Sequence, residues 1–496
     1  MSSELKGQVL SGVLWNSLAR LGQQALQFGF SVLLARLLLP EDFGTVSMIL
    51  VFTGFVGMFA DVGFSSALVQ KRELDLRQIQ SVFWFNIAIG VALSLLTLLA
   101  APWLARFYRN PDLESVTRVW SVTFVLVTLG LAPAALMQRR MQFRRLAWIS
   151  MVATVLSGAV GVLLALLGWG VWSLVAQNLI SNSIITVLNW AVSGLRPQLT
   201  FTIEALRELW SYTVHLFGFN FVNYWARNAD SLLIGRIFGA VALGIYNRAY
   251  GLMLLPITQI ISVIASVMFP ALSSIQHDTK RVKRGYLKAM VLISFASFPI
   301  MIGLLATARP FILTLYGEKW ADVIPILRIL CIAGLVQALL NPTGWLYTSQ
   351  GRTDWLFRWG VAGGGVLVMS ILAGVLLGSV EAVAACYAVA NLLLLYPGIA
   401  IPGRLIDMRF GDVVRSVAGP AIASAIMGLI VAGLGAALPG GWPDWQRLLI
   451  LVASGVLAYA ALIFGFRMSA GSEALSVFRE LMLRRKEEGS AVEPVL

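Results

Sequence analysis

The sequence predicts an all-α polytopic membrane protein, and three observations support that fold class. Of the 496 residues, 58% are hydrophobic and only 12% are charged, whereas soluble globular proteins are about half apolar and a quarter charged. The mean hydropathy is +0.81. Apolar stretches of about 20 residues, the length that crosses a bilayer as a helix, recur from one end of the sequence to the other.

The hydropathy pattern predicts about fourteen transmembrane helices. They are expected at residues 11–38, 43–68, 81–105, 116–137, 147–167, 170–193, 210–235, 243–274, 286–308, 322–348, 357–377, 381–402, 414–438 and 446–466. The first segment carries Arg20, Gln23, Gln24 and Gln27, so we expect a retained span with a polar face and not a cleaved signal peptide. After the last span, residues 473–488 are amphipathic and are expected to form an interfacial helix.

The distribution of positive charge fixes the expected topology. Lysines and arginines accumulate in cytoplasmic loops, and most of the 37 lie in every second loop, on the side of the N-terminus. Both ends are therefore expected to be cytoplasmic. The same bias explains the net charge of +13, so no nucleic-acid partner is expected. The basic segment Gln138–Leu146 fits either an ordinary cytoplasmic loop, which we favour, or a segment that lies on an anionic leaflet.

The positions of polar residues and glycines indicate an internal repeat with an offset of 200 residues. Polar or basic residues at 20, 23, 27 and 36 match polar or basic residues at 220, 223, 227 and 236, and Gly44 matches Gly244. The first and seventh spans are six apart and run in the same direction, so the repeats are predicted to be parallel. We expect two pseudo-symmetric six-helix lobes at 1–200 and 201–410, an extra helix pair at 411–468 and a cytoplasmic tail at 469–496.

The polar faces of the first and seventh spans predict a hydrated, cationic cleft between the lobes. Residues 16, 20, 23 and 27 fall on one helical face, and 220, 223, 227 and 230 do the same. Charges inside a bilayer usually face water or protein because lipid exposure is costly. Arg20 has no acid within one turn and favours a binding role. For Arg227 a buried ion pair with Asp230 is equally well supported.

The remaining charged residues in the spans are open to two interpretations. Arg36 and Arg236 lie near the outer ends of their spans and are expected to extend to the lipid headgroups. Arg248 fits either this arrangement or the outer mouth of the cleft. Asp61 is a candidate for protonation or ion coupling, as is Asp230, but capping of a helix break explains Asp61 equally well.

Motifs of enzymatic chemistry are missing from the sequence. It contains no G-x-x-x-x-G-K-[ST] loop for ATP, and its two histidines, His215 and His277, have no second metal ligand near them in sequence. Cys331 and Cys386 lie in apolar runs and are expected to pack as small hydrophobic residues. We therefore expect no cofactor, no metal and no catalytic residues.

A specific combination of residues occurs in the segments 35–44, 61–68, 228–236, 243–250 and 269–273. In these segments the chain resembles the polysaccharide transporter family, which belongs to the multidrug/oligosaccharidyl-lipid/polysaccharide flippase superfamily. The resemblance covers roughly residues 5–410 and is closest to the colanic acid and lipopolysaccharide-repeat exporter branch. This resemblance implies a fourteen-helix flippase in a bacterial cytoplasmic (inner) membrane. Its implied substrate is an undecaprenyl-diphosphate-linked oligosaccharide for exopolysaccharide or lipopolysaccharide biosynthesis.

Residue chemistry supports a diphosphate cargo, because the guanidinium group of arginine binds phosphate oxygens in a bidentate fashion. The hypothesis assigns substrate binding to a set of polar residues and movement to alternating access of the two lobes. The candidate binding residues are Arg20, Gln23, Gln27, Asn223, Arg227 and Arg248. The expected partners are the lipid-linked oligosaccharide and the bilayer, with the polysaccharide polymerase and export machinery as further candidates.

Two other functions stay open at this point. An ion-coupled exporter of small cations from the same superfamily would need acids, not arginines, in the cleft. A membrane glycosyltransferase, polymerase or ligase that uses the same lipid carrier would need catalytic acids or a histidine in an outer loop. Asp112 and Glu114 are near enough in sequence to form a carboxylate pair, but no other residue supports catalysis.

Overall fold

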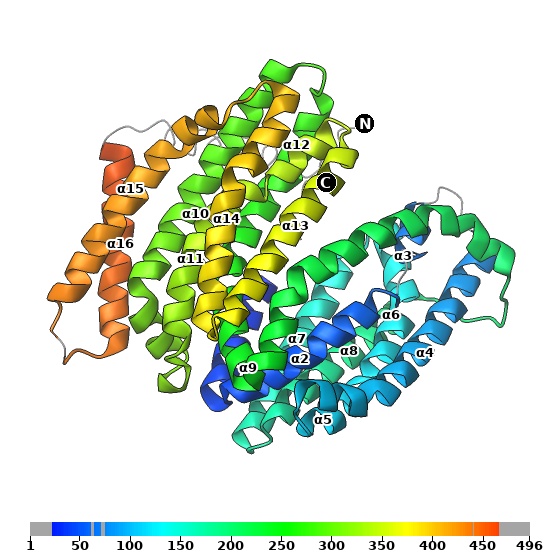
Figure 1. Ribbon diagram of the computed structural model, residues 1–496. Helices are drawn as coiled ribbons and strands as arrows, with labels where there is room; N and C mark the ends of the chain where they lie inside the picture. Colours follow the sequence, from blue (N-terminus) through cyan, green and yellow to red (C-terminus); the bar gives the residue numbers. More distant parts are fainter. Residues whose placement is uncertain (1–21, 61–63, 71–74, 440, 466–496) are drawn as a thin grey trace, which may run out of the picture. The chain divides into compact units, whose positions relative to one another are not determined.

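The computed structural model describes residues 22–60, 64–70, 75–439 and 441–465, except the side chains at 66, 67, 70, 205–223, 226, 227 and 269. It consists of two compact units, Met1–Gly244 and Ile245–Leu496 (Figure 1). The predicted positions of Arg20, Asp61, the helix 473–488 and the tail 469–496 lie outside the described residues.

All regular elements among the described residues are helices, which confirms the all-α fold class. Eleven helical stretches in this part of the chain are long and apolar enough to cross a membrane. The count of fourteen stays a prediction, because the first two predicted spans lie partly outside the description and the seventh and eighth are joined in one element. The first helix is described over residues 22–37. The helices that follow it are α2 (Pro40–Gly57), α3 (Phe64–Gln70), α4 (Leu76–Tyr108), α5 (Asp112–Trp120), α6 (Val122–Arg139), α7 (Phe143–Leu166), α8 (Val171–Ser193), α9 (Ile203–Ser274), α10 (Thr279–Leu315), α11 (Val323–Leu340), α12 (Thr343–Ser349), α13 (Thr353–Leu376), α14 (Val380–Gly403), α15 (Phe410–Ala437) and α16 (Asp444–Gly465).

Two predicted spans are each divided into two helices. The span expected at 116–137 consists of α5 and α6, which meet at Ser121, and the span at 322–348 consists of α11 and α12, with Pro342 between them. Proline lacks the N–H that would continue a helix, which explains the second break. Hydropathy averages over such breaks, so the sequence pattern predicted one helix in each place.

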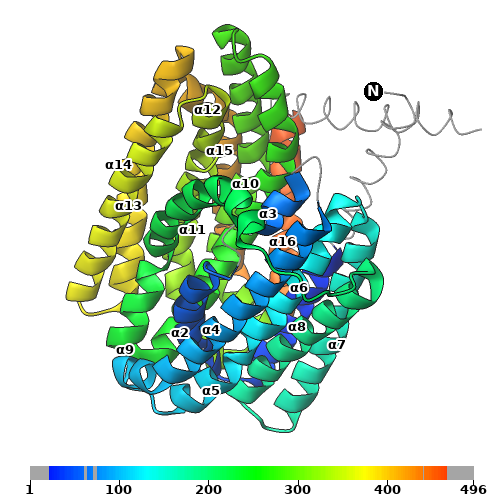
Figure 2. The same cartoon turned by 90° about the vertical axis from the view of Figure 1, so that its right-hand side faces the viewer.

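In the first unit, α4, α6, α7 and α8 pack into one layer of neighbouring helices (Figure 2). The helix at 22–37 lies along α7. Gly22 faces Met151 and Gly158 faces Phe30, so residue numbers rise together along both helices. The two helices therefore run in the same direction, as the predicted order requires for the first and fifth spans.

The start of α2 packs against α9 through direct backbone contact. A Cβ atom added to Gly44 would lie 2.5 Å from the carbonyl carbon of Ala240, and one added to Gly244 would lie 2.9 Å from that of Pro40. Gly239 breaks α9 with a φ of 86°, a value that suits glycine because it lacks a Cβ. Adding 200 converts Pro40 to Ala240 and Gly44 to Gly244, so the two contacts exchange. Such reciprocity is expected of two equivalent segments around a local two-fold axis, and it supports the predicted repeat.

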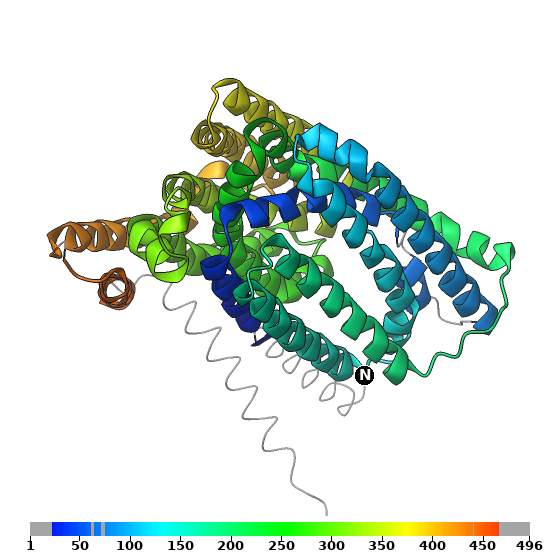
Figure 3. The same ribbon diagram turned by 90° about the horizontal axis from the view of Figure 1, so that it is seen from below.

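In the second unit, α10 packs against both α11 and α15, and α14 packs against α11 and α13. The helices α15 and α16 lie together at one edge of this unit (Figures 1 and 3). An ion pair of 2.6 Å between Lys283 Nζ and Asp412 Oδ2 joins the first turns of α10 and α15. Lys283 also donates a hydrogen bond to the backbone oxygen of Asp407, which fixes the connection that precedes α15.

Candidate functional site

The polar face of the first helix is described from Gln23 onward. Gln23 Nε2 donates a hydrogen bond of 3.4 Å to Thr154 Oγ1 on α7, and its side chain is half-buried. Gln27, one turn later, is exposed. The two glutamines therefore have different roles in the packing, because Gln23 contacts a neighbouring helix and Gln27 offers its amide to the surroundings. The placement of Arg20 on this face stays a prediction.

On α9, Asp230 is 95% buried with 5% of its surface exposed. Its Oδ1 atom accepts a hydrogen bond of 2.7 Å from the backbone N–H of Ser231. The side chains of Asn223 and Arg227 on the same helix lie outside the description, so the predicted Arg227–Asp230 pair stays a prediction. Burial makes Asp230 a residue whose charge needs compensation, which agrees with either a structural or an ion-coupling role.

An aromatic cluster that the sequence analysis did not identify lies next to this region. Tyr224 donates a hydrogen bond of 2.6 Å to the backbone oxygen of Val51, and the ring of Phe55 packs against both Tyr224 and Trp225. These contacts join α2 to α9 at a second point, about two turns of α2 after the Gly44 contact. A tyrosine four residues before Asn228 was visible in the sequence, but its partner lies 173 residues away along the chain.

In the second unit, Arg248 lies over two neighbouring aromatic rings, whose centres are 6.0 Å apart. Its guanidinium carbon is 5.2 Å from the centre of the Tyr316 ring and 5.1 Å from the centre of the Trp320 ring. Cations within about 6 Å of a ring face are attracted by its quadrupole. The structure thus places Arg248 against an aromatic cage formed by Tyr316 and Trp320. The two interpretations given above, and a direct role in substrate binding, stay predictions.

Arg36 and Arg236 occupy unlike surroundings although they are equivalent in the repeat. Arg36 is exposed, whereas the guanidinium carbon of Arg236 lies 5.5 Å from the centre of the Phe107 ring at the end of α4. Arg36 thus has room to extend to headgroups, and Arg236 is held against an aromatic residue of its own unit.

A buried hydrogen-bond network in the second unit was also missed by the sequence analysis. Gln337 Nε2 donates to Tyr387 Oη at 2.7 Å, and Tyr387 Oη lies 3.4 Å from Tyr250 Oη. Asn391 donates to the backbone oxygen of Tyr387. The network joins α9, α11 and α14. The sequence signal that could have identified it is the presence of isolated polar residues in otherwise apolar spans. Amides and phenols of this kind order a membrane protein interior because each must find a partner there.

An apolar cavity of about 470 Å³ lies among α10, α15 and α16. Its wall includes Phe295, Pro299, Phe311, Val452 and Phe464, and nearly all of the atoms that line it are apolar. Such a surface accepts hydrocarbon and offers almost no hydrogen-bonding groups to a sugar. The cavity therefore fits a lipid chain and not a glycan.

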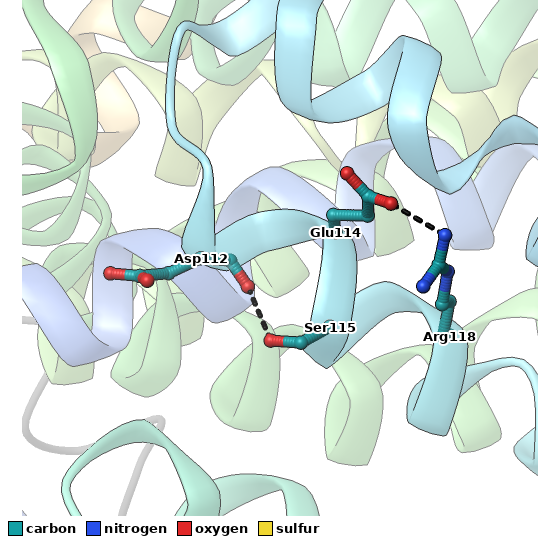
Figure 4. Close-up of polar contacts among 4 residues, drawn as sticks. All are labelled: Asp112, Glu114, Ser115 and Arg118. Carbon is teal, nitrogen blue, oxygen red and sulfur yellow. Dashed lines mark hydrogen bonds and ion pairs between the residues drawn. The ribbon is translucent and has the colours of Figure 1, made fainter.

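The acidic pair that an enzyme would need does not form a two-carboxylate site. Glu114 makes an ion pair of 2.5 Å with Arg118, one turn later on α5. Figure 4 shows the carboxylate of Asp112 pointing away from Glu114, while its backbone oxygen accepts a hydrogen bond from Ser115. General acid–base catalysis by two carboxylates requires both groups to face one reacting bond, and this geometry does not meet that requirement.

The family described as "Polysaccharide biosynthesis protein" matches residues 33–325, more than half of the chain. The chain belongs to this family. Among its relatives, the teichuronic acid biosynthesis protein TuaB of Bacillus subtilis is 29% identical over 462 residues, which cover 92% of this chain and 95% of the relative. The succinoglycan biosynthesis transport protein ExoT of Rhizobium meliloti is 29% identical over 492 residues, with 97% and 98% covered.

The fold of this family member is also that of a known transporter structure. The lipid II flippase MurJ, in an inward closed conformation, superposes with a TM-score of 0.75 at 15% sequence identity, covering 92% of this chain and 99% of MurJ. At this identity the likeness shows the fold alone. The resemblance inferred from the sequence segments is thus confirmed at the level of family and fold.

Proposed function

We propose that this protein is a flippase that moves lipid-linked oligosaccharide units across the cytoplasmic membrane by alternating access. The single observation that carries the proposal is similarity along 97% of the chain to a relative described as a polysaccharide transport protein. The flippase-type fold and the helical, apolar composition support the same function. An enzyme is disfavoured because neither the family nor the fold is that of an enzyme.

The proposed cargo has three chemically distinct parts, and the proposal assigns residues of the chain to each of them. The arginines Arg20 and Arg227 supply the charge that a diphosphate needs to leave the headgroup region. Gln23, Gln27 and Asn223 supply amides that hydrogen-bond to sugar hydroxyl groups. The apolar cavity among α10, α15 and α16 accepts a hydrocarbon chain of the carrier or of the bilayer.

The location follows from the same proposal. A lipid-linked precursor is made on the cytoplasmic side and used on the opposite side, so the flippase must reside in the cytoplasmic membrane. The charge bias of the loops supports a cytoplasmic location for both termini. The polymerase and the export machinery, which consume the flipped unit, are the proposed downstream partners.

The decisive experiment is a gene deletion followed by analysis of the envelope polysaccharides and of the lipid-linked precursors. We expect loss of one polysaccharide together with accumulation of its lipid-linked repeat unit, and restoration of both by the wild-type gene. Loss of the polysaccharide without accumulation of a precursor would point to synthesis and would contradict the proposal.

The small-molecule exporter makes a different prediction that the same strain can test. If the cargo were a cationic drug, expression in a strain without its own multidrug pumps would raise resistance several-fold. We expect no change in susceptibility, because the charged residues of the predicted cleft are mainly arginines, which repel a cation.

A further inference from the structure

The segment between α8 and α9 is held against the start of α4 by a set of hydrogen bonds. Gln80, which is only 1% exposed, donates through Nε2 to the backbone oxygen of Arg196 at 2.9 Å and accepts through Oε1 from the backbone N–H of Gln198 at 3.0 Å. Trp84 Nε1 donates to the backbone oxygen of Gln198 at 2.7 Å. The segment passes the end of α4 in both views (Figures 1 and 3).

These bonds fix the register of the segment and therefore the direction of its side chains. Ser81 Oγ accepts the backbone N–H of Thr202 at 3.0 Å and lies 3.4 Å from Thr202 Oγ1, so Thr202 faces α4. The side chains of Leu199, Phe201 and Ile203 take no part in these bonds, and 89%, 51% and 68% of their surfaces are exposed.

A second exposed basic segment adjoins this one. In the loop between α6 and α7, Arg140 Nη1 donates to the backbone oxygen of Ser193 at 2.7 Å, at the end of α8. Arg139 donates to the backbone oxygen of Leu68 on α3 at 3.1 Å. These two arginines interact with carbonyl groups near helix C-termini, where positive charge is favourable. Arg144 and Arg145 are exposed, and so are the apolar residues Met141 and Trp148.

We propose that these two segments together form a surface that binds an anionic lipid leaflet. We call it the basic edge and define it as Met141, Arg144, Arg145, Trp148, Arg196, Leu199, Phe201 and Ile203. Irregular backbone cannot lie in the hydrocarbon core because its polar groups need partners, whereas three large exposed apolar side chains are unfavourable in water. The boundary between headgroups and acyl chains satisfies both conditions. Arginines at that depth attract phosphate groups.

The inference is tested by the depth of spin labels in vesicles of mixed phosphatidylglycerol and phosphatidylcholine. Labels are attached at L199C, F201C and T202C in a background that carries Cys386→Ser, because Cys386 is partly exposed and Cys331 is buried. We expect labels at 199 and 201 to collide several-fold more with oxygen than with a water-soluble nickel chelate. The label at 202, where the native hydroxyl lies 3.4 Å from Ser81 Oγ on α4, should show a lower ratio.

The charge requirement is tested in the same vesicles. Replacement of Arg144, Arg145 and Arg196 by Gln should reduce the depth of the label at 201, and replacement of phosphatidylglycerol by phosphatidylcholine should have the same effect. Arg358→Gln serves as the matched control, since Arg358 is exposed in the other unit, and it should leave the depth unchanged.

Three outcomes would overturn the inference. Equal access of the nickel chelate to labels at 199, 201 and 202 would place the segment in water. Labels at 199 and 201 that neither agent reaches would indicate a protein partner on this surface. Unchanged depth after the triple replacement would remove the anionic lipid from the proposal. Label depth is measured without transport. The result therefore tests the lipid-binding surface independently of the flippase function.

Discussion

The contact between Gly44 and α9 allows a sharp test of the backbone packing, through the substitution Gly44→Ala. The added Cβ would lie 2.5 Å from the carbonyl carbon and 3.0 Å from the Cα atom of Ala240, whereas carbon atoms prefer separations of about 3.5–4.0 Å. The atoms in the way belong to the backbone of Ala240, which cannot relieve the clash by a change of rotamer as a side chain can. The two helices must separate by about 1 Å at this point, and overpacking of this kind costs about 1–3 kcal/mol.

The matched control is Gly29→Ala, on the described part of the first helix, where an added Cβ meets no atom within 4 Å. Alanine should be neutral or stabilising there, because it is the better helix former by roughly 0.5–1 kcal/mol. We therefore expect thermal unfolding of the purified protein in detergent to occur at a lower temperature for G44A than for G29A. A penalty of about 2 kcal/mol would also lower the population of any transport state that needs this contact by about 30-fold.

The reciprocal geometry adds a stronger condition. Gly244→Ala should destabilise the protein to a similar degree, since its Cβ would lie 2.9 Å from the carbonyl carbon of Pro40 and 3.0 Å from the backbone nitrogen of Gly44. In the double variant, helices already separated by the first methyl group have room for the second, so the loss should be smaller than the sum of the two single losses. Strict additivity, or a G44A protein as stable as G29A, would refute the reasoning.

Three further substitutions test other parts of the structure. Arg248→Lys keeps the charge but loses the planar group that lies over the rings of Tyr316 and Trp320, so thermal stability should fall by about 0.5–2 kcal/mol; an unchanged unfolding temperature would contradict the cage. Gln337→Leu leaves the buried hydroxyl of Tyr387 without its donor, and the expected loss is about 1–3 kcal/mol, measured by the same unfolding assay against an exposed control such as Gln27→Leu. Arg20→Ala should abolish polysaccharide export at an unchanged protein level, and Arg20→Lys tests whether charge alone suffices; near-normal export by the alanine variant would remove Arg20 from the site.

The sequence could propose candidate site residues because the signals for them are local, and their role in binding stays a prediction. A polar residue in an apolar span is visible by composition, and a spacing of three and four places Gln23 and Gln27 on one helical face. The family could be identified from short segments such as 35–44. Such signals do not identify the partner of each residue. Arg248 is an example, because both rings of its cage lie about 70 residues further along the chain. Spacing rules within one helix do not predict contacts at that separation.

The sequence by itself determined the helical, membrane-embedded character of this protein and its family, since these depend on composition, on short motifs and on periodicities within a few turns of helix. Only the tertiary structure decided that Gly44 and Gly244 meet, that Arg248 lies over the rings of Tyr316 and Trp320, and that Gln80 holds the segment before α9. These contacts join residues brought together by packing, and burial of apolar surface drives packing without specifying from any one segment which distant segment it meets. The physical reason is thus one of range: helix formation is local, whereas the contacts that shape the site are not.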